Sequence, residues 1–308
     1  MTATTNNGLA GSERRAARTP HADPLELALA AKRRTGTPGG ATERLVASGA
    51  GWRVADIVCT CGPHDHPYDE GHTFASISLV LSGTFNCRSD AGSALLSEGS
   101  YMLLSPGQAY ECSHRHGEGD RCLSFQFTPE LFNRLSRDAG ARAAFASHRL
   151  PPLRELAPVT ARARIGLEAP DSLNALEEVA IELAGAVVEV AGRMRREPSV
   201  PASHHARIAR LLRHWNALAD GPRTLAELAD SAGLSPYHFL RTFKHVTGVT
   251  PHQWLLRARL REAARRLAAG RDPVTDIALD VGFEDLSNFM RSFRAEFGMS
   301  PRRYRLAA

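Results

Sequence analysis

The C-terminal third of this chain contains one sequence unit twice, and this repeat constrains the fold more than any other feature. The stretch 224–251, TLAELADSAGLSPYHFLRTFKHVTGVTP, is similar to the stretch 274–301, VTDIALDVGFEDLSNFMRSFRAEFGMSP. From Ser235 onward the offset is a constant 50 residues, which pairs Phe239 with Phe289 and Arg241 with Arg291. A repeat of this kind indicates that one supersecondary unit occurs twice in the structure.

Each copy predicts two short helices joined by a tight turn. Thr224 and Glu227 have the spacing of a capping box at the start of the first helix. Gly233 permits the turn that ends this helix. Ser235 caps the second helix, and Asp285 has the same role in the second copy.

The second helix of each copy has an apolar face and a basic face. In the first copy the apolar face holds Phe239, Phe243 and Val246, and the opposite face holds Tyr237, His238, Arg241 and Lys244. Two short helices with a glycine turn, the second basic on its outer face, are typical of a helix-turn-helix unit that reads the major groove. A helix over 252–270 would hold the two units about 34 Å apart, near one DNA turn. The alternative is a helical bundle with a basic surface, which does not explain two registered copies.

The charge distribution agrees with a nucleic-acid-binding C-terminal part. Residues 203–308 contain 17 Lys and Arg against 10 Asp and Glu, whereas residues 1–202 contain 21 against 23. A basic third on a near-neutral body favours nucleic-acid binding by that third, although a solvated basic surface would give the same count.

The region 44–128 has a different pattern, in which short apolar runs alternate with turn signals such as SDAGS, SEGS, SPGQ and HGEGD. Turns every 8–12 residues predict an antiparallel β sandwich or barrel. Residues 129–150 and 171–197 read as helices, and the second has an apolar stripe that could pack on the barrel or on another subunit. The fold class is therefore α+β, with an antiparallel β-barrel and flanking helices before an all-α double helix-turn-helix.

These patterns divide the chain into five parts. Residues 1–40 are predicted to be disordered, with one short helix at PLELALAAKRR. Residues 41–168 form the sensor domain, 169–197 a dimerisation helix, 198–206 a linker and 207–308 the DNA-binding domain. No apolar run approaches the roughly 20 residues of a membrane helix. The N-terminus lacks a secretory hydrophobic core, which predicts a cytoplasmic protein without a membrane partner.

The segment ARLREAARRLAAGRDPVTDIALDVGFEDLSNFMRSFRAEFGMSPRRYR resembles the signature of the AraC/XylS family of bacterial transcription regulators. The VLSG…LLSPG region is similar to the cupin-like effector domain common in that family. The resemblance implies a non-enzymatic, dimeric, DNA-binding regulator, usually an activator, whose partners are promoter DNA, RNA polymerase and a small-molecule or metal effector.

The family motif also implies which residues contact DNA. The first reading helix would contact bases through Tyr237, Leu240 and Arg241, and the second through Ser287, Asn288 and Arg291. Leu240 departs from the polar residue common there, and it could touch a thymine methyl group but could not hydrogen-bond a base edge. The basic residues Lys244, His245 and Arg294 are expected at phosphates, with His238 on the same face.

The chain also carries a partial metal-site pattern of cupin enzymes. His64, His66 and Glu70 have a suggestive spacing, but they precede the strand, and Tyr110 stands where the distant histidine would follow the Pro106–Gly107 turn. This argues against the alternative function, a metal-dependent cupin enzyme fused to a DNA-binding module.

A second candidate site uses sulfur. The five cysteines of the chain include Cys59 and Cys61, and the stretch ECSHRHGEGDRC adds Cys112, His114, His116 and Cys122. Thiolates and imidazoles are ligands that zinc and copper(I) prefer, so a metal site is one interpretation. A thiol switch is another, and buried cysteines acting as small hydrophobic residues are the third.

A pocket for an organic effector would use inward strand residues. His72 lies eight residues before VLSG, where the family often has a histidine near its effector pocket. We expect His72, Phe74 and Tyr110 to line such a pocket, although most inward residues serve only as core.

Overall fold

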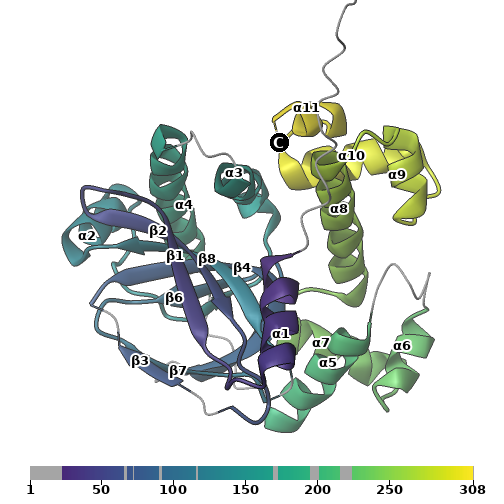
Figure 1. The fold of residues 1–308 in the computed structure, drawn as a ribbon, viewed down its shortest axis with the longest axis horizontal. Helices are drawn as coiled ribbons and strands as arrows, with labels where there is room; N and C mark the ends of the chain where they lie inside the picture. The colour runs from purple at the N-terminus through teal and green to yellow at the C-terminus, as the bar shows by residue number, and fades with distance from the viewer. Residues whose placement is uncertain are drawn as a thin grey trace, which may run out of the picture.

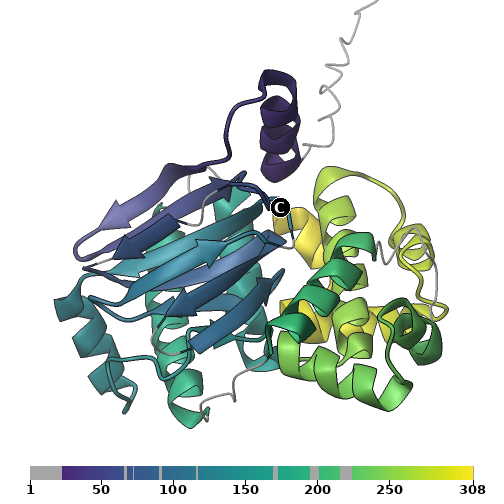
Figure 2. The same cartoon turned by 90° about the horizontal axis from the view of Figure 1, so that it is seen from below.

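The computed structural model of this protein describes residues 23–65, 68–71, 73–89, 92–115, 117–168, 173–194, 201–215 and 224–307. Residues 41–194 form a β domain with helices on one side (Figure 1). Residues 202–307 form a helical domain, here called the helix-turn-helix domain, which packs against the β domain (Figure 2). The α+β fold class predicted from the sequence is confirmed.

The β domain consists of two antiparallel sheets that share one long strand. Its strands are β1 (Ala41–Gly49), β2 (Trp52–Cys59), β3 (Tyr68–Gly71), β4 (Ala75–Ser89), β5 (Gly92–Ser97), β6 (Tyr101–Leu104), β7 (Ala109–Ser113), β8 (Asp120–Phe127) and β9 (Arg149–Leu150). One sheet has the order β1-β2-β8-β4-β6-β9, and the other contains β3, β7, β4 and β5. Strand β4 passes from one sheet to the other near Gly83. This glycine has a φ of 80°, and a Cβ there would lie 2.4 Å from the carbonyl oxygen of Gly119.

The two sheets pack face to face. Their shared core draws on strands of both sheets and consists of Val80, Phe85, Cys87, Leu96, Met102, Leu104, Tyr110, Cys112 and Cys122. Side chains alternate between the faces of a strand. Ile77 and Leu79 of β4 therefore point to the other face of the first sheet, where they join a larger core with the helices.

Helices α2 (Pro129–Asp138), α3 (Ala157–Glu168) and α4 (Leu173–Arg193), together with the short helix η1 (Arg154–Leu156), cover that other face (Figure 1). The apolar stripe of α4 contains Leu176, Leu183 and Val187, which are at most 2% exposed. They pack into the core of their own β domain. Of the two partners expected for this stripe, the barrel and another subunit, the structure shows the barrel. The role of 169–197 in dimerisation stays a prediction.

Helix α1 (Pro24–Thr35) lies in the N-terminal stretch that was predicted to be disordered, at the position of the expected short helix. Asp23 caps it by accepting a hydrogen bond from the backbone N–H of Leu25, and Gly36 ends it with a φ of 66°. Leu25 is buried, and Lys32 donates to the carbonyl of Thr60 at 2.8 Å. Helix α1 is thus attached to the β domain.

The helix-turn-helix domain contains α5 (Ala202–His214), α6 (Leu225–Ser231), α7 (Pro236–Thr247), α8 (Pro251–Ala269), α9 (Val274–Asp280), α10 (Leu286–Phe297) and α11 (Pro301–Ala307). Each repeat has its own core, one around Phe239 and Phe243 and the other around Phe289 and Phe293. Helix α5 begins inside the predicted linker 198–206, because Ile208 and its neighbours bury an apolar face in the first of these cores. None of the helices described is both long and apolar enough to cross a membrane.

Candidate DNA-binding surface and sensor sites

The first helix-turn-helix unit, α6 and α7, is held by the local interactions that the sequence predicts. The Thr224 hydroxyl accepts the backbone N–H of Glu227 at 3.2 Å, and the Glu227 carboxylate accepts the N–H of Thr224 at 2.7 Å. Gly233 has a φ of 62° in the turn. Ser235 accepts the N–H of His238 at 3.4 Å at the start of α7. These caps satisfy donors that a helix N-terminus leaves without partners.

The second unit, α9 and α10, repeats the turn and the cap of the second helix, whereas its first helix has no side-chain cap. Gly282 has a φ of 88° in the turn. The carboxylate of Asp285 accepts the backbone N–H groups of Ser287 at 3.0 Å and Asn288 at 2.9 Å. The two reading helices therefore have equivalent starts, and α8 connects them.

The predicted DNA contacts lie on the exposed faces of α7 and α10. All nine are exposed: Tyr237, His238, Leu240, Arg241, Lys244, Ser287, Asn288, Arg291 and Arg294. The exposed fraction is 66% for Tyr237 and 37% for Leu240. Met290 is also 37% exposed, and it matches Leu240 at the offset of 50 residues. The alignment of the two repeats is the sequence signal that marks this residue. His245, expected at a phosphate, is instead half-buried.

The first repeat packs against β5 and β9 of the β domain. The guanidinium of Arg149, only 2% exposed, donates to the carbonyl oxygen of Val246 in the last turn of α7. It also lies 3.5 Å from the carbonyl oxygens of Leu95 and His245. Leu95 itself joins the core of the first repeat. Sequence reasoning missed Arg149, because nothing in its local pattern shows that it is buried.

The second repeat packs against α3. Ala161 of α3 is part of the core around Phe289 and Phe293, and Glu98 of the β domain pairs with Arg261 of α8 at 2.5 Å. Both helix-turn-helix units therefore pack on the β domain through surfaces other than the predicted DNA-contacting faces, which are exposed to solvent.

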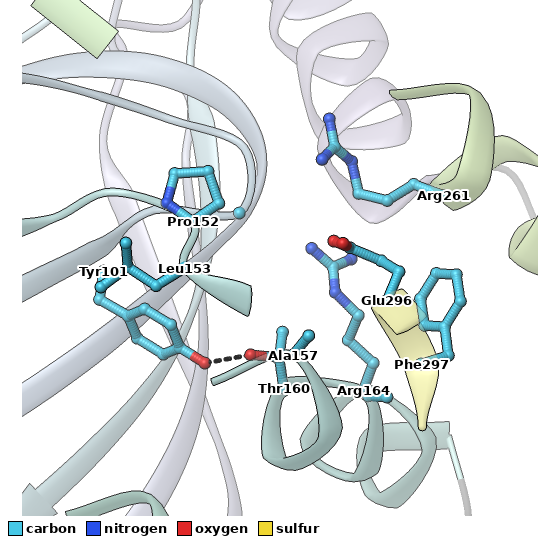
Figure 3. Close-up of a pocket in the computed structure, with 11 residues that line it drawn as sticks. Tyr101, Pro152, Leu153, Ala157, Thr160, Arg164, Arg261, Glu296 and Phe297 are labelled. Atoms are coloured by element: carbon cyan, nitrogen blue, oxygen red, sulfur yellow. Dashed lines mark hydrogen bonds between the residues drawn. The ribbon is translucent and has the colours of Figure 1, made fainter. Parts of the chain in front are cut away.

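A small cavity lies at this junction (Figure 3). It is lined by Tyr101 and Thr160 of the β domain, whose hydroxyls are 2.5 Å apart, and by Arg261 and Phe297 of the helix-turn-helix domain. Burial raises the pKa of Tyr101 to about 12, so the phenol is neutral. The cavity volume of about 30 Å³ suits ordered water rather than an organic effector.

A buried polar cluster lies on the face of the first sheet that points toward the second sheet. Ser76, Ser78 and Ser124 are at most 2% exposed, and their hydroxyls lie 3.0–3.1 Å from one another. Gln126 donates to Ser124 at 3.3 Å and accepts from Arg53 at 2.7 Å. Polar side chains at core positions are candidates for contacts with a polar ligand. The alternation of serine with Ile77 and Leu79 is the sequence signal that could have found them.

The predicted effector residues are not brought together. Phe74 is half-buried with the Arg53 guanidinium 5.7 Å from its ring centre. Tyr110 lies on β7, opposite Ser89 at the far end of β4, in the core between the sheets. His72 lies outside the described residues, as do His66 and His116 of the two metal patterns, and His64 is exposed in a turn. The expected grouping of Phe74 with Tyr110 is wrong, because β4 places them at its opposite ends.

Of the sulfur-containing candidates, the structure groups Cys59, Cys61 and His114, with one ligand atom from each within 4.8 Å of the others. Cys112 is instead opposite Cys87 on β4, and Cys122 donates to Asp120 at 3.2 Å. Burial raises the pKa of Cys59 and Cys61, which keeps both thiols protonated in the metal-free protein. The predicted six-residue site is thus reduced to three described residues.

Comparison with known protein families gives two matches. A helix-turn-helix domain matches residues 228–307. An AraC-like ligand binding domain matches residues 60–214, just over half of the 308 residues.

The individual relatives match over about a quarter of this chain. The probable transcriptional regulator LumQ of Photobacterium leiognathi is 41% identical over 81 residues, which cover 26% of this chain and 33% of LumQ. The HTH-type transcriptional activator RhaS of Escherichia fergusonii is 44% identical over 78 residues, which cover 25% of this chain and 28% of RhaS. The chain therefore spans a third or less of these curated relatives. The crystal structure of the DNA-binding domain of AdpA, a global transcriptional factor, in complex with a target DNA has a TM-score of 0.31 and 31% identity, covering 33% of this chain and 91% of that domain.

Proposed function

Because the chain belongs to the AraC family of transcription regulators, we propose that it binds promoter DNA sequence-specifically and activates transcription. The observation that carries this proposal is the pair of helix-turn-helix units. Each has a buried apolar face and an exposed reading face with a basic residue at the matched positions Arg241 and Arg291. Two such units connected by one helix can read adjacent major-groove segments.

The two kinds of side chain on each reading face have different roles in this proposal. Arg241 and Arg291 contact guanine edges, and the apolar Leu240 and Met290 contact thymine methyl groups. Tyr237, Ser287 and Asn288 contribute further base contacts. The remaining residues, His238, Lys244 and Arg294, contact phosphates, which position the protein without specifying sequence.

The signal is sensed in the β domain and reaches the readers through the junction between the domains. In this proposal a polar effector binds near Ser76, Ser78 and Ser124, whose buried hydroxyls supply hydrogen-bonding groups. A change in either sheet would reach α7 through Arg149 and α8 through the Glu98–Arg261 pair. Coupling of this type typically changes affinity by a factor of about 5–150.

The other parts of the proposal concern the setting in which the protein acts. It acts as a homodimer on promoter DNA in the cytoplasm and contacts RNA polymerase, without a catalytic step of its own. Since the apolar stripe of α4 is buried within the chain, the dimer contact uses another surface.

The test is a binding selection from random DNA with the full chain at moderate salt. We expect an enriched sequence with two half-sites about one helical turn apart. The double variant Arg241→Ala/Arg291→Ala, checked for a native circular dichroism spectrum, serves as the matched control and should enrich no such sequence. If the wild type enriches no sequence, and its affinity for DNA depends on salt concentration but not on sequence, the protein binds DNA non-specifically and the proposal of sequence-specific reading is rejected.

A further inference from the structure

We propose that Cys59, Cys61 and His114 bind one thiophilic metal ion, zinc or copper(I), at one end of the β domain. The three residues come from different parts of the fold. Cys59 ends β2, Cys61 follows in the next loop, and His114 follows β7. This site is separate from the reading helices, and the proposal does not depend on the proposed DNA-binding function.

The distances between the ligand atoms suit a mononuclear site. One sulfur from each cysteine and one ring nitrogen of His114 all lie within 4.8 Å of one another. In a tetrahedral zinc site, with bonds of about 2.0–2.3 Å, ligand atoms are about 3.5 Å apart. Closure of the site therefore requires movements of about 1 Å, which side-chain rotation supplies. The three residues are between 1% and 6% exposed, so the site is shielded from water.

The hydrogen bonds of His114 provide a second, independent observation. Its Nε2 lies 2.6 Å from the Asp120 carboxylate, whereas its buried Nδ1 has no hydrogen-bond partner among the described residues. A buried polar atom without a partner is costly, of the order of 1–3 kcal/mol. A metal ion bound to Nδ1 removes this cost. A carboxylate that holds the other ring nitrogen is the usual orienting partner of a metal-binding histidine.

The backbone around the cysteines is held in place without a metal. Cys59 lies directly opposite Asp120 in the pairing of β2 with β8, and the carbonyl of Cys61 accepts the N–H of Gly119 at 2.8 Å. Gly119 has a φ of 66°, and a Cβ there would lie 2.5 Å from the carbonyl oxygen of Cys59. Asp65 accepts the N–H of Gly62 at 2.7 Å and fixes the rest of the loop. The ligands are thus presented by a pre-formed frame, which a binding site requires.

The ligand types select the metal. Two thiolates and an imidazole favour zinc or copper(I) over magnesium or calcium, which prefer oxygen ligands. Three protein ligands also leave one coordination position for solvent or another ligand in the case of zinc. Cys122, whose sulfur donates to the second oxygen of Asp120, is placed to orient Asp120 rather than to bind the ion.

The test starts with the full chain purified under reducing conditions without chelator. We expect about one zinc or copper ion per chain by elemental analysis, and the two elements distinguish the two versions of the site. After chelator treatment, titration with Co²⁺ should give sulfur-to-cobalt charge-transfer absorption and tetrahedral ligand-field bands that saturate at one equivalent. No bound metal, together with no such bands, would overturn the proposal. A disulfide between Cys59 and Cys61 in a protein that also binds neither zinc, copper nor Co²⁺ would instead assign the pair to thiol chemistry.

Variants locate the site. Cys59→Ser, Cys61→Ser and His114→Ala should each lose the bound ion, whereas Cys87→Ser should retain it, since Cys87 is equally buried but lies outside the group. Equal loss in Cys87→Ser would mean non-specific thiol binding and would contradict the assignment. Asp120→Asn leaves all three ligands in place and should weaken Co²⁺ binding by about 10–100-fold. The Co²⁺ absorption bands of Asp120→Asn therefore test the metal site even where a ligand variant folds poorly.

Discussion

Arg149 of the β domain donates a hydrogen bond to the carbonyl oxygen of Val246, in the last turn of the first reading helix. The last carbonyls of a helix lack partners within the helix and carry a partial negative charge. In this protein a side chain from the other domain supplies the partner and the positive charge. The orientation of α7 is therefore coupled to strand β9, which pairs with β6 in the first sheet.

Replacing Arg149 with Met keeps much of the side-chain volume but removes the guanidinium. We expect the free energy of unfolding to fall by about 1–3 kcal/mol, because buried carbonyl groups lose their donor. Urea denaturation of the full chain measures this change. Arg115→Met, at an exposed position, is the control and should change stability by less than about 0.5 kcal/mol. Equal effects of the two substitutions would show that Arg149 does not hold the junction.

The second prediction separates base contacts from phosphate contacts. Arg241→Ala and Arg291→Ala should each cost about 1–3 kcal/mol of binding to the selected DNA and relax its specificity at one position. Lys244→Ala and Arg294→Ala should weaken binding to all sequences about equally and reduce the salt dependence. Affinities of the four variants for selected and scrambled DNA at two salt concentrations test this. If Arg241→Ala and Arg291→Ala weaken both DNAs equally, these arginines contact phosphates.

The features that were predictable from the sequence are local ones. The capping box of Thr224, the turn at Gly233 and the cap at Asp285 depend on residues a few positions apart, and the structure confirms each of them. The contact of Arg149 with α7 joins two domains, so no local pattern marks it. The alternation of serine with Ile77 and Leu79 marks Ser76 and Ser78 locally, but their contact with Ser124 depends on a strand far away in the chain. The sulfur-containing group lies between these cases. The spacing of Cys59 and Cys61 predicts that they lie together. That Cys112 lies opposite Cys87 and outside their group depends on how the strands pair, which the spacing does not show.

The third prediction concerns the attachment of α1. Asp65 accepts hydrogen bonds from Lys32 at 2.7 Å and from the N–H of Gly39 at 2.9 Å, which lower the pKa of its carboxyl from 3.8 to about 2. A lowered pKa in the folded state stabilises the protein above the unfolded pKa, and this stability is lost as the pH falls through the folded value. Asp65→Asn should therefore cost about 2 kcal/mol at neutral pH.

The pH dependence makes this prediction specific. The difference in stability between wild type and Asp65→Asn should be constant from pH 7 to about pH 5 and should shrink between about pH 4 and pH 2. Thermal denaturation across this range measures it. Glu118→Gln is the control, because Glu118 pairs with Arg33 at 3.7 Å with both side chains more than 60% exposed, and it should change little. A pH-independent difference would assign the effect of Asp65→Asn to packing rather than to charge.

The last prediction compares two glycines that end the reading helices. Gly248 and Gly298 follow α7 and α10 with φ values of 80° and 70°, so alanine at either position costs about 1–2 kcal/mol of backbone strain. Their surroundings differ. A Cβ at Gly248 would lie 2.4 Å from the Cβ of Pro151, whereas a Cβ at Gly298 would meet Pro158 at 3.4 Å, which is ordinary contact.

Gly248→Ala should therefore lower the melting temperature of the full chain more than Gly298→Ala does. The excess isolates the contact between α7 and the β domain, since the backbone strain is common to both variants. The substitution Pro151→Ala keeps the Cβ atom that a Cβ at position 248 would meet. The double variant Gly248→Ala/Pro151→Ala should therefore remain less stable than Gly298→Ala. Equal melting temperatures for the two single variants would mean that the first reading helix does not rest on the β domain as closely as Gly248 and Pro151 indicate.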